Sequence, residues 1–340
     1  MIVVMNESAS CDQVSAVETA IKKIGYKPNN IRFHGDSNSK FTMKGEAPDS
    51  TPLKDLPGVV DILDADENLK LAHRELHPED TVVQVGDAKF GDGNFHMIAG
   101  PCAVESLEQT LRIAERVRKA GAQVLRGGAY KPRTSPYSFQ GLGERGLEIL
   151  AKVREKIGLA IVTEALDPRT APTVAQYADM IQIGTRNMQN FSLLETVGQL
   201  GKPVMLKRGM SATLDELLAA AEYVMSNGCH NLIVCERGIR TFSRHSRNTL
   251  DLGLIPVFKR ISHLPIIVDP SHASGERANV APLANAALGV GADGIMVDVH
   301  DRPEDAMVDG DQAILPEEFD QMMLQLRAMG KALDRRAGEF

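Results

Sequence analysis

Apolar and polar positions alternate with two different rhythms along the chain. From about residue 95 onward, eight short apolar runs alternate with longer segments whose apolar residues recur at helical spacing. The strand-like runs are FHMIAG, AQVLRG, LAIVTE, DMIQIG, PVMLKR, NLIVCER, LPIIVDP and DGIMVDV. Helical patterns between them include LEQTLRIAERVRKAG, LDELLAAAEYVMSNG and VAPLANAALGVG. Eight strand–helix units in roughly 245 residues predict a (β/α)8 barrel.

An open, doubly wound sheet with helices on both faces is the architecture that competes with this barrel. Such sheets usually carry a glycine-rich GxGxxG turn after their first strand. The first predicted strand here runs into AGPCAVES, which lacks that pattern. The sequence therefore favours an α/β fold of the TIM-barrel type, and we assign it to residues 76–340.

Residues 1–75 show a different order of elements. IVVM is typical of a short strand, and Val14, Val17 and Ile21 then recur at helical spacing. NIRFHG and KFTMKG alternate around a polar DSNS turn, as the strands of a hairpin do. A weak helix in TPLKDLPG and a strand in VVDILDA complete a β-α-β-β-α-β order. We therefore predict a small ferredoxin-like α+β domain before the barrel.

Composition and charge limit the classes of function that fit. The 340-residue chain has 43% hydrophobic and 24% charged residues, as ordinary globular proteins do. Its formal net charge of −7 argues against a general nucleic-acid binder, which is usually basic. No apolar run approaches the length that crosses a membrane, and the first residues lack the cationic start of a signal peptide. The four cysteines show no CxxC spacing, which fits the reducing cytosol. Together these features lead us to expect a cytoplasmic enzyme that binds neither nucleic acid nor membrane.

Every predicted strand ends in or beside a side chain that can bind an anion, a metal or a proton. These residues are Cys102, Arg126, Glu164, Arg186, Lys207, Arg237, Asp269 with His272, and Asp298. A single charged residue in such a place usually just faces water. Eight of them at the same end of eight strands are hard to explain by solvation. Because barrel active sites lie at this end of the strands, we predict one shared polar site.

Six cations at or just after the strand ends point to anionic ligands. They are Arg126, Lys131, Arg133, Arg186, Lys207 and Arg237. Like charges in one pocket repel unless anions offset them, and arginine binds phosphate and carboxylate with paired hydrogen bonds. We expect ligands with more than one anionic group to offset these charges. The alternative is an internal charge network with Glu144, Glu164 and Glu236.

A second set of residues is typical of a divalent metal site. It consists of Cys102, His272, Asp298 and Asp309. Thiolate, imidazole and carboxylate suit a transition metal, and strand 8 of a barrel closes onto strand 1, which makes these residues neighbours. Each has a plainer interpretation alone: a buried cysteine, a loop histidine, a strand-end acid and a turn aspartate. Their joint placement favours the metal.

Several motifs together resemble one enzyme family. They are AGPCAVES, LRGGAYKPRTSPYSFQGLG, IQIGTRNMQNF, LKRGMSAT, CERGIRTF, RNTLDL, HLPIIVDPSHASG and GADGIMVDVH. They resemble 3-deoxy-D-arabino-heptulosonate 7-phosphate (DAHP) synthase of type I-beta, which has an N-terminal ferredoxin-like (ACT-like) regulatory domain. The similarity is weak over 1–75 and strong from about residue 77 onward. The KPRTSPYSFQG string is specific, since the related octulosonate-phosphate and sialate-type synthases lack KPRTS.

The resemblance implies condensation of phosphoenolpyruvate with erythrose 4-phosphate, the first step of the shikimate pathway. It implies that phosphoenolpyruvate is bound by Arg126, Lys131, Arg186, Lys207 and Arg237. It places erythrose 4-phosphate at Lys131, Pro132, Arg133 and Thr134, and one divalent metal ion (Mn, Fe, Co, Zn or similar) at Cys102, His272, Asp298 and Asp309. Lys131 then protonates the developing alkoxide, and Glu164 lies near the attacking water.

The resemblance also leaves points open. The family usually has glutamate where this chain has Asp298. Because aspartate is shorter by one methylene group, the resemblance leaves open whether Asp298 binds the metal directly. The subgroup implies a homotetramer whose N-terminal domain binds an aromatic amino acid and mediates feedback control. The alternative is an N-terminal domain that supports assembly or stability and binds no ligand. Two other functions remain: another phosphoenolpyruvate-dependent sugar-acid synthase, such as 3-deoxy-octulosonate 8-phosphate synthase, and a catalytically silent barrel that senses an amino acid.

Overall fold

The computed structural model describes residues 2–6, 8–26, 28–31, 40–42, 51–63, 71–333 and 335. The chain forms two compact units, Met1–Pro78 and Glu79–Phe340. None of the described helices is long and apolar enough to span a membrane.

The described residues of the first unit form one four-stranded sheet and two helices. Its elements are β1 (Ile2–Met5), α1 (Cys11–Lys23), β2 (Asn29–Ile31), β3 (Lys40–Thr42), α2 (Thr51–Lys54) and β4 (Val59–Leu63). The strands lie in the order β2-β3-β1-β4, and the neighbouring strands are antiparallel. The predicted DSNS turn, residues 36–39, lies outside the described residues. The ferredoxin-like type of this domain stays a prediction.

Helix α1 shows how the sequence builds this unit. Ser10 caps its first turn by accepting a hydrogen bond from the backbone of Gln13, while the Gln13 side chain accepts one from the backbone of Ser10. Val14, Val17 and Ile21 are buried on one face and pack in a cluster with residues of the sheet. The helical spacing of these residues therefore serves to cover the sheet.

The second unit is a closed barrel of eight parallel strands. They are β7 (His96–Gly100), β8 (Val124–Arg126), β9 (Ala160–Ala165), β10 (Met180–Ile183), β11 (Val204–Lys207), β12 (Leu232–Glu236), β13 (Ile266–Val268) and β14 (Gly294–Asp298). The barrel closes where β14 pairs with β7, from Gly294 opposite His96 to Asp298 opposite Gly100. All eight predicted strands are present, so the predicted TIM barrel is confirmed.

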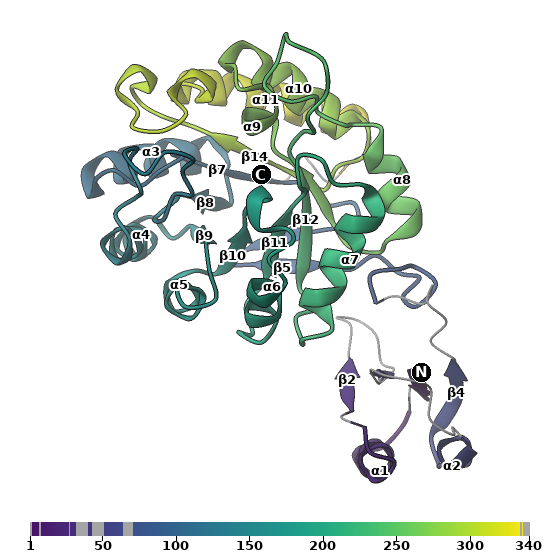
Figure 1. Ribbon diagram of the computed structural model, residues 1–340. Helices are drawn as coiled ribbons and strands as arrows, with labels where there is room; N and C mark the ends of the chain where they lie inside the picture. Colours follow the sequence, from purple (N-terminus) through teal and green to yellow (C-terminus); the bar gives the residue numbers. More distant parts are fainter. Residues whose placement is uncertain are drawn as a thin grey trace. The chain divides into compact units, whose positions relative to one another are not determined.

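Helices surround the ring of strands (Figure 1). They are α3 (Leu107–Ala120), α4 (Glu144–Ile157), α5 (Ala171–Tyr177), α6 (Phe191–Gly198), α7 (Leu214–Met225), α8 (Leu254–Ile261), α9 (Pro270–Ser274), α10 (Val280–Gly289) and α11 (Pro316–Ala332). Short 3-10 turns are η1 (Thr185–Asn187), η2 (Arg277–Asn279), η3 (Pro303–Asp305) and η4 (Gly310–Gln312). Helix α3 is typical: Ser106 caps its start, and Gly121 ends it in the left-handed conformation with φ of 113°.

A hairpin that the sequence analysis did not identify covers the amino ends of the barrel strands. It consists of β5 (Val83–Val85) and β6 (Ala88–Phe90), and its inward side chains join the apolar core of the barrel. Phe90 lies against Gly294 at the start of β14, and Gly86 lies against Ala160 at the start of β9. Because apolar side chains fill this end, the polar site lies at the opposite, carboxyl end.

Candidate active site

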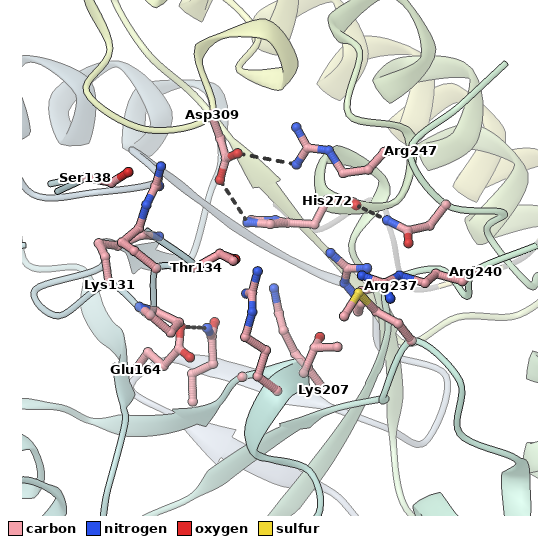
Figure 2. Close-up of a pocket in the computed structure, with 18 of the residues that line it drawn as sticks. Lys131, Thr134, Ser138, Glu164, Lys207, Arg237, Arg240, Arg247, His272 and Asp309 are labelled. Atoms are coloured by element: carbon pink, nitrogen blue, oxygen red, sulfur yellow. Dashed lines mark hydrogen bonds and ion pairs between the residues drawn. The ribbon is translucent and has the colours of Figure 1, made fainter. Parts of the chain in front are cut away.

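A pocket of about 500 Å³ lies at the carboxyl ends of the barrel strands (Figure 2). Its lining residues from the predicted set are Arg126, Lys131, Pro132, Arg133, Thr134, Glu164, Arg186, Lys207, Arg237, His272 and Asp309. The remaining lining residues are Ser135, Ser138, Gln182, Gly184, Thr185, Met210, Arg240, Arg247 and Asn248. The structure thus brings together the predicted substrate residues, as well as two metal candidates.

The six predicted cations all face this pocket, with different degrees of burial. Arg126, Lys131, Lys207 and Arg237 are buried, while Arg133 is partly buried and Arg186 is exposed on η1. Arg240 and Arg247 also line the pocket, on the segment between β12 and α8, and the sequence analysis did not select them. They were missed because they follow the strand by several residues, in a loop with no regular spacing.

Two of the buried cations are paired with protein carboxylates, which corrects the expectation that ligands alone offset them. Arg126 Nη1 lies 2.6 Å from Asp298 Oδ1, and Lys207 Nζ forms an ion pair with Asp269 Oδ2. The acids that the alternative interpretation proposed are not involved. Glu236 instead pairs with Arg208 at 2.9 Å. A buried charge needs a counter-charge nearby, and these two carboxylates supply it.

Arg237 is the buried cation whose hydrogen bonds are least satisfied. Only 8% of it is exposed, and its Nη1 has no hydrogen-bond partner among the residues that the structure describes. Burial lowers the pKa of its guanidinium, which the nearby Asp269 offsets only in part. A buried donor of this kind is costly unless an acceptor meets it, so an anionic ligand at this point is favourable.

The metal candidates meet at the edge of the pocket. Cys102 Sγ lies 3.3 Å from Asp309 Oδ2 and 3.8 Å from His272 Nε2, and the last two atoms are 3.9 Å apart. Metal–ligand bonds of about 2.0–2.3 Å place neighbouring ligands at such separations, so this donor set fits one divalent ion. Single ligand atoms of Cys102, His272 and Asp298 also lie within 4.8 Å of one another.

Asp269 orients the histidine of this cluster. Its Oδ1 accepts the backbone N–H of His272, and its Oδ2 lies 2.8 Å from His272 Nδ1. Burial alone would lower the pKa of His272, but Asp269 and Asp298 outweigh it and raise the pKa to about 9. The ring is therefore fixed with Nδ1 toward the acids and Nε2 toward Cys102 and Asp309, as in many metal sites with a carboxylate behind the histidine.

Asp309 reaches the cluster from an unusual backbone conformation. It has a left-handed φ of 55°, and it accepts a hydrogen bond from Arg247 Nη1 at 3.3 Å. Burial alone would raise its pKa, but His272, Cys102 and Arg247 outweigh this effect and lower the pKa to about 2. Figure 2 shows Asp309 between His272 and Arg247, with a dashed line to each. The carboxylate is therefore ionised and ready to bind a cation.

Asp298 is the most deeply buried member of the set. Its Oδ1 accepts from Arg126 Nη1 at 2.6 Å, and its Oδ2 accepts from Gln312 Nε2 at 2.5 Å. The same Oδ2 lies 3.7 Å from His272 Nδ1. Both oxygens of this short side chain are thus already engaged by protein donors. Gln312 was not identified in the sequence, since nothing in its spacing distinguishes it.

Lys131 connects the two halves of the site. Its Nζ donates to the backbone oxygen of Cys102 at 3.0 Å and lies 3.1 Å from Cys102 Sγ. It is buried, and it begins the loop that carries Pro132, Arg133 and Thr134 along the pocket. The ammonium group therefore lies between the metal candidates and the cation-lined cavity, within reach of a ligand that touches both.

The fold and site together define an enzyme class: a barrel that binds phosphate-bearing or carboxylate-bearing substrates beside a thiol, imidazole and carboxylate cluster. Residues 74–335 match the DAHP synthetase I family, and the chain belongs to this family.

Individual relatives agree with this assignment. A phospho-2-dehydro-3-deoxyheptonate aldolase from Thermotoga maritima is 53% identical over 264 residues, which are 78% of each chain. A 2-dehydro-3-deoxyphosphooctonate aldolase from Syntrophobacter fumaroxidans is 31% identical over 254 residues, covering 69% of this chain and 87% of that protein. The crystal structure of the Thermotoga maritima DAHP synthase matches with a TM-score of 0.78 and 44% identity, covering 98% of both chains. A truncated form of that synthase matches with a TM-score of 0.74 and 48% identity, covering 78% of this chain and 98% of its own.

Proposed function

We propose that this pocket is where the chain condenses phosphoenolpyruvate with erythrose 4-phosphate and water, giving DAHP and phosphate. This is the DAHP synthase reaction of the shikimate pathway, and it agrees with the family and with the heptonate aldolase relative. The observation that carries the proposal is that the KPRTS loop, Lys131–Ser135, lines the same pocket as the buried cations and the metal candidates.

Phosphoenolpyruvate fits the buried cations of the pocket together with the exposed Arg186. We assign it to Arg126, Lys131, Arg186, Lys207 and Arg237. A phosphate and a carboxylate meet the unsatisfied Nη1 of Arg237 and the charges of its neighbours. Because Asp298 and Asp269 offset Arg126 and Lys207, each of these ion pairs is neutral as a whole. Arg126 and Lys207 therefore serve mainly as hydrogen-bond donors.

Erythrose 4-phosphate fits the loop beyond Lys131. We assign it to Lys131, Pro132, Arg133 and Thr134, which line the same cavity. Arg133 is the partly buried cation of this loop, and its guanidinium suits the second phosphate. The two substrates bring two phosphates and one carboxylate, in agreement with the excess of cations.

A divalent ion fits the cluster beside the pocket. We assign Cys102, His272 and Asp309 as its main ligands and Asp298 as a weaker fourth, because Arg126 and Gln312 already bond to the oxygens of Asp298. When bound, such an ion supplies a Lewis acid beside the aldehyde of the sugar phosphate. The donors suit several transition metals, so they do not select one.

Two side chains then carry the protons. As C3 of phosphoenolpyruvate bonds to the aldehyde carbon, the aldehyde oxygen takes a proton from Lys131 Nζ and becomes a hydroxyl. A water oxygen bonds to C2 and gives a proton to Glu164. The C2–O bond to phosphate then breaks, and the new C2 hydroxyl passes its proton to the departing phosphate as the ketone forms. Exchange with solvent removes the proton from Glu164 and returns one to Lys131, which restores both groups.

For the N-terminal unit we propose a regulatory role. In this proposal residues 1–75 form a domain that binds an aromatic amino acid, and residues 76–340 form the catalytic barrel. The protein assembles as a homotetramer. The match of a truncated Thermotoga maritima form to 78% of this chain supports a barrel that folds without the first unit.

The choice of aldehyde tests the proposed reaction. Purified protein with added Mn²⁺ is incubated with phosphoenolpyruvate and either erythrose 4-phosphate or arabinose 5-phosphate, and released phosphate is measured. We expect release with the four-carbon sugar phosphate and little with the five-carbon one. Release mainly with arabinose 5-phosphate would instead establish the octulosonate reaction, to which the 31% identical relative points.

A further inference from the structure

Gln182 is a buried pocket residue that the sequence analysis passed over. It lies in β10, directly opposite Glu164 of β9 in the register of the two parallel strands. Its side-chain Nε2 donates a hydrogen bond to Glu164 Oε2 at 3.0 Å, drawn as a dashed line at Glu164 in Figure 2. Only 5% of Gln182 is exposed, so water has little access to compete for this hydrogen bond.

Glu164 needs such support because no ion pair among the described residues fixes its orientation. It is 7% exposed in a pocket that contains Lys207 and several arginines, yet no described residue forms an ion pair with it. A carboxylate also repels the phosphate and carboxylate of the substrates at short range. Its position must therefore be fixed, so that it faces the water and not the anionic groups.

Gly184 completes the support from the other side. A Cβ atom at this position would lie 2.0 Å from Glu164 Oε1, closer than any real contact. The φ angle of Gly184 is an ordinary −71°, so the need for glycine here is steric. One oxygen of Glu164 is thus held by the amide of Gln182, and the other lies over bare backbone and remains able to accept a proton.

We infer that Gln182 is a positioning residue for the condensation, which holds Glu164 where it accepts the proton of the water that attacks C2. This inference rests on the proposed function. In this role Gln182 acts through Glu164, and Gly184 leaves the space that this orientation of Glu164 requires.

The test is a double-mutant cycle on the steady-state rate of phosphate release. Gln182→Met keeps the length of the side chain but removes the amide, and Glu164→Gln removes the proton acceptor. We expect Gln182→Met to lower kcat by roughly tenfold with the KM for phosphoenolpyruvate changed by less than about twofold, because positioning affects the chemical step. In the Glu164→Gln background the same change should have little further effect, since coupled residues are not additive.

Controls separate a positioning role from a structural one. Gln199→Met removes a surface amide that donates to Asn227 outside the pocket, and it should leave kcat and KM unchanged. If Gln182→Met fails to fold, Gly184→Ala displaces the carboxylate of Glu164 by steric contact and should give the same loss of kcat. A wild-type protein that releases no phosphate refutes the proposed function. An active wild type with unchanged Gln182→Met turnover, or with fully additive effects in the double variant, refutes the inference about Gln182.

Discussion

Arg126 and Asp298 form a buried ion pair at the mouth of the barrel, with 2.6 Å between Nη1 and Oδ1. Strands β8 and β14 carry these residues on either side of β7, so the pair connects their carboxyl ends. Burial alone would lower the pKa of Arg126, but Asp298 and Cys102 outweigh it and raise the pKa. The pair therefore joins the cations that we propose bind phosphoenolpyruvate to the residues that we propose bind the metal.

Asp298→Asn should weaken metal binding without abolishing it. The variant leaves the charge of Arg126 buried and unpaired, and breaking a buried pair typically costs about 3–5 kcal/mol of stability. Loss of a weak or indirect ligand usually lowers metal affinity by roughly 10–100-fold. Metal content is measured after dialysis at several free-metal concentrations. Asp301→Asn is the control, because it removes an acid that pairs with Arg112 away from the metal candidates. Metal affinity equal to that of the wild type would remove Asp298 from the metal site.

Lys131→Ala should nearly abolish turnover while phosphoenolpyruvate still binds. The ammonium supplies the proton of the new hydroxyl, whereas several other cations remain to hold the substrate. General acid catalysis of this kind contributes roughly 10²–10⁴-fold to the rate. Phosphate release gives the turnover, and calorimetric titration gives the binding. Turnover similar to that of the wild type would exclude this role for Lys131.

Stability should decline in mild acid because of His230. Burial lowers the pKa of this histidine to about 4, whereas an unfolded histidine titrates near about 6.5. Between these values the unfolded chain binds a proton that the folded chain does not, so the free energy of unfolding falls as pH decreases from about 6.5 to about 4. Guanidinium unfolding at several pH values measures this slope. His230→Asn should flatten it and the exposed His245→Asn should not; an unchanged slope in His230→Asn would contradict the assignment.

Removal of residues 1–75 should leave an active barrel that no aromatic amino acid inhibits. The barrel has its own closed sheet and core, and each predicted substrate and metal residue lies within it. Phosphate release is measured for the full and shortened chains with and without tyrosine or phenylalanine. Inhibition that survives the deletion would place the effector site on the barrel.

The barrel was predictable because its signals are local and repeated. Eight apolar runs at regular spacing, with helical patterns between them, specify the strands. The polar residues that follow each run indicate that the active site lies at the carboxyl ends of the strands. Hairpin β5–β6 was missed because three-residue strands such as Val83–Val85 carry too little pattern to be distinguished from a loop.

The sequence predicted many of the residues that gather around the pocket, but not how their charges pair. Cys102 and His272 follow strand ends, so topology alone brings them together. The partners of each charge depend on side-chain reach, which a sequence does not show; hence the pairs of Arg126 with Asp298 and Lys207 with Asp269 were not foreseen. Gln182 was missed because an amide in a buried strand resembles any other polar residue until its neighbour is known.

The release of phosphate from phosphoenolpyruvate in the presence of erythrose 4-phosphate, before and after treatment with a chelator, tests the central claim most directly. We predict release that requires both substrates, that is lost on chelation, and that returns when Mn²⁺ is added back. Absence of release by the metal-loaded protein, or release that the chelator does not affect, would contradict a metal-dependent condensation in this pocket.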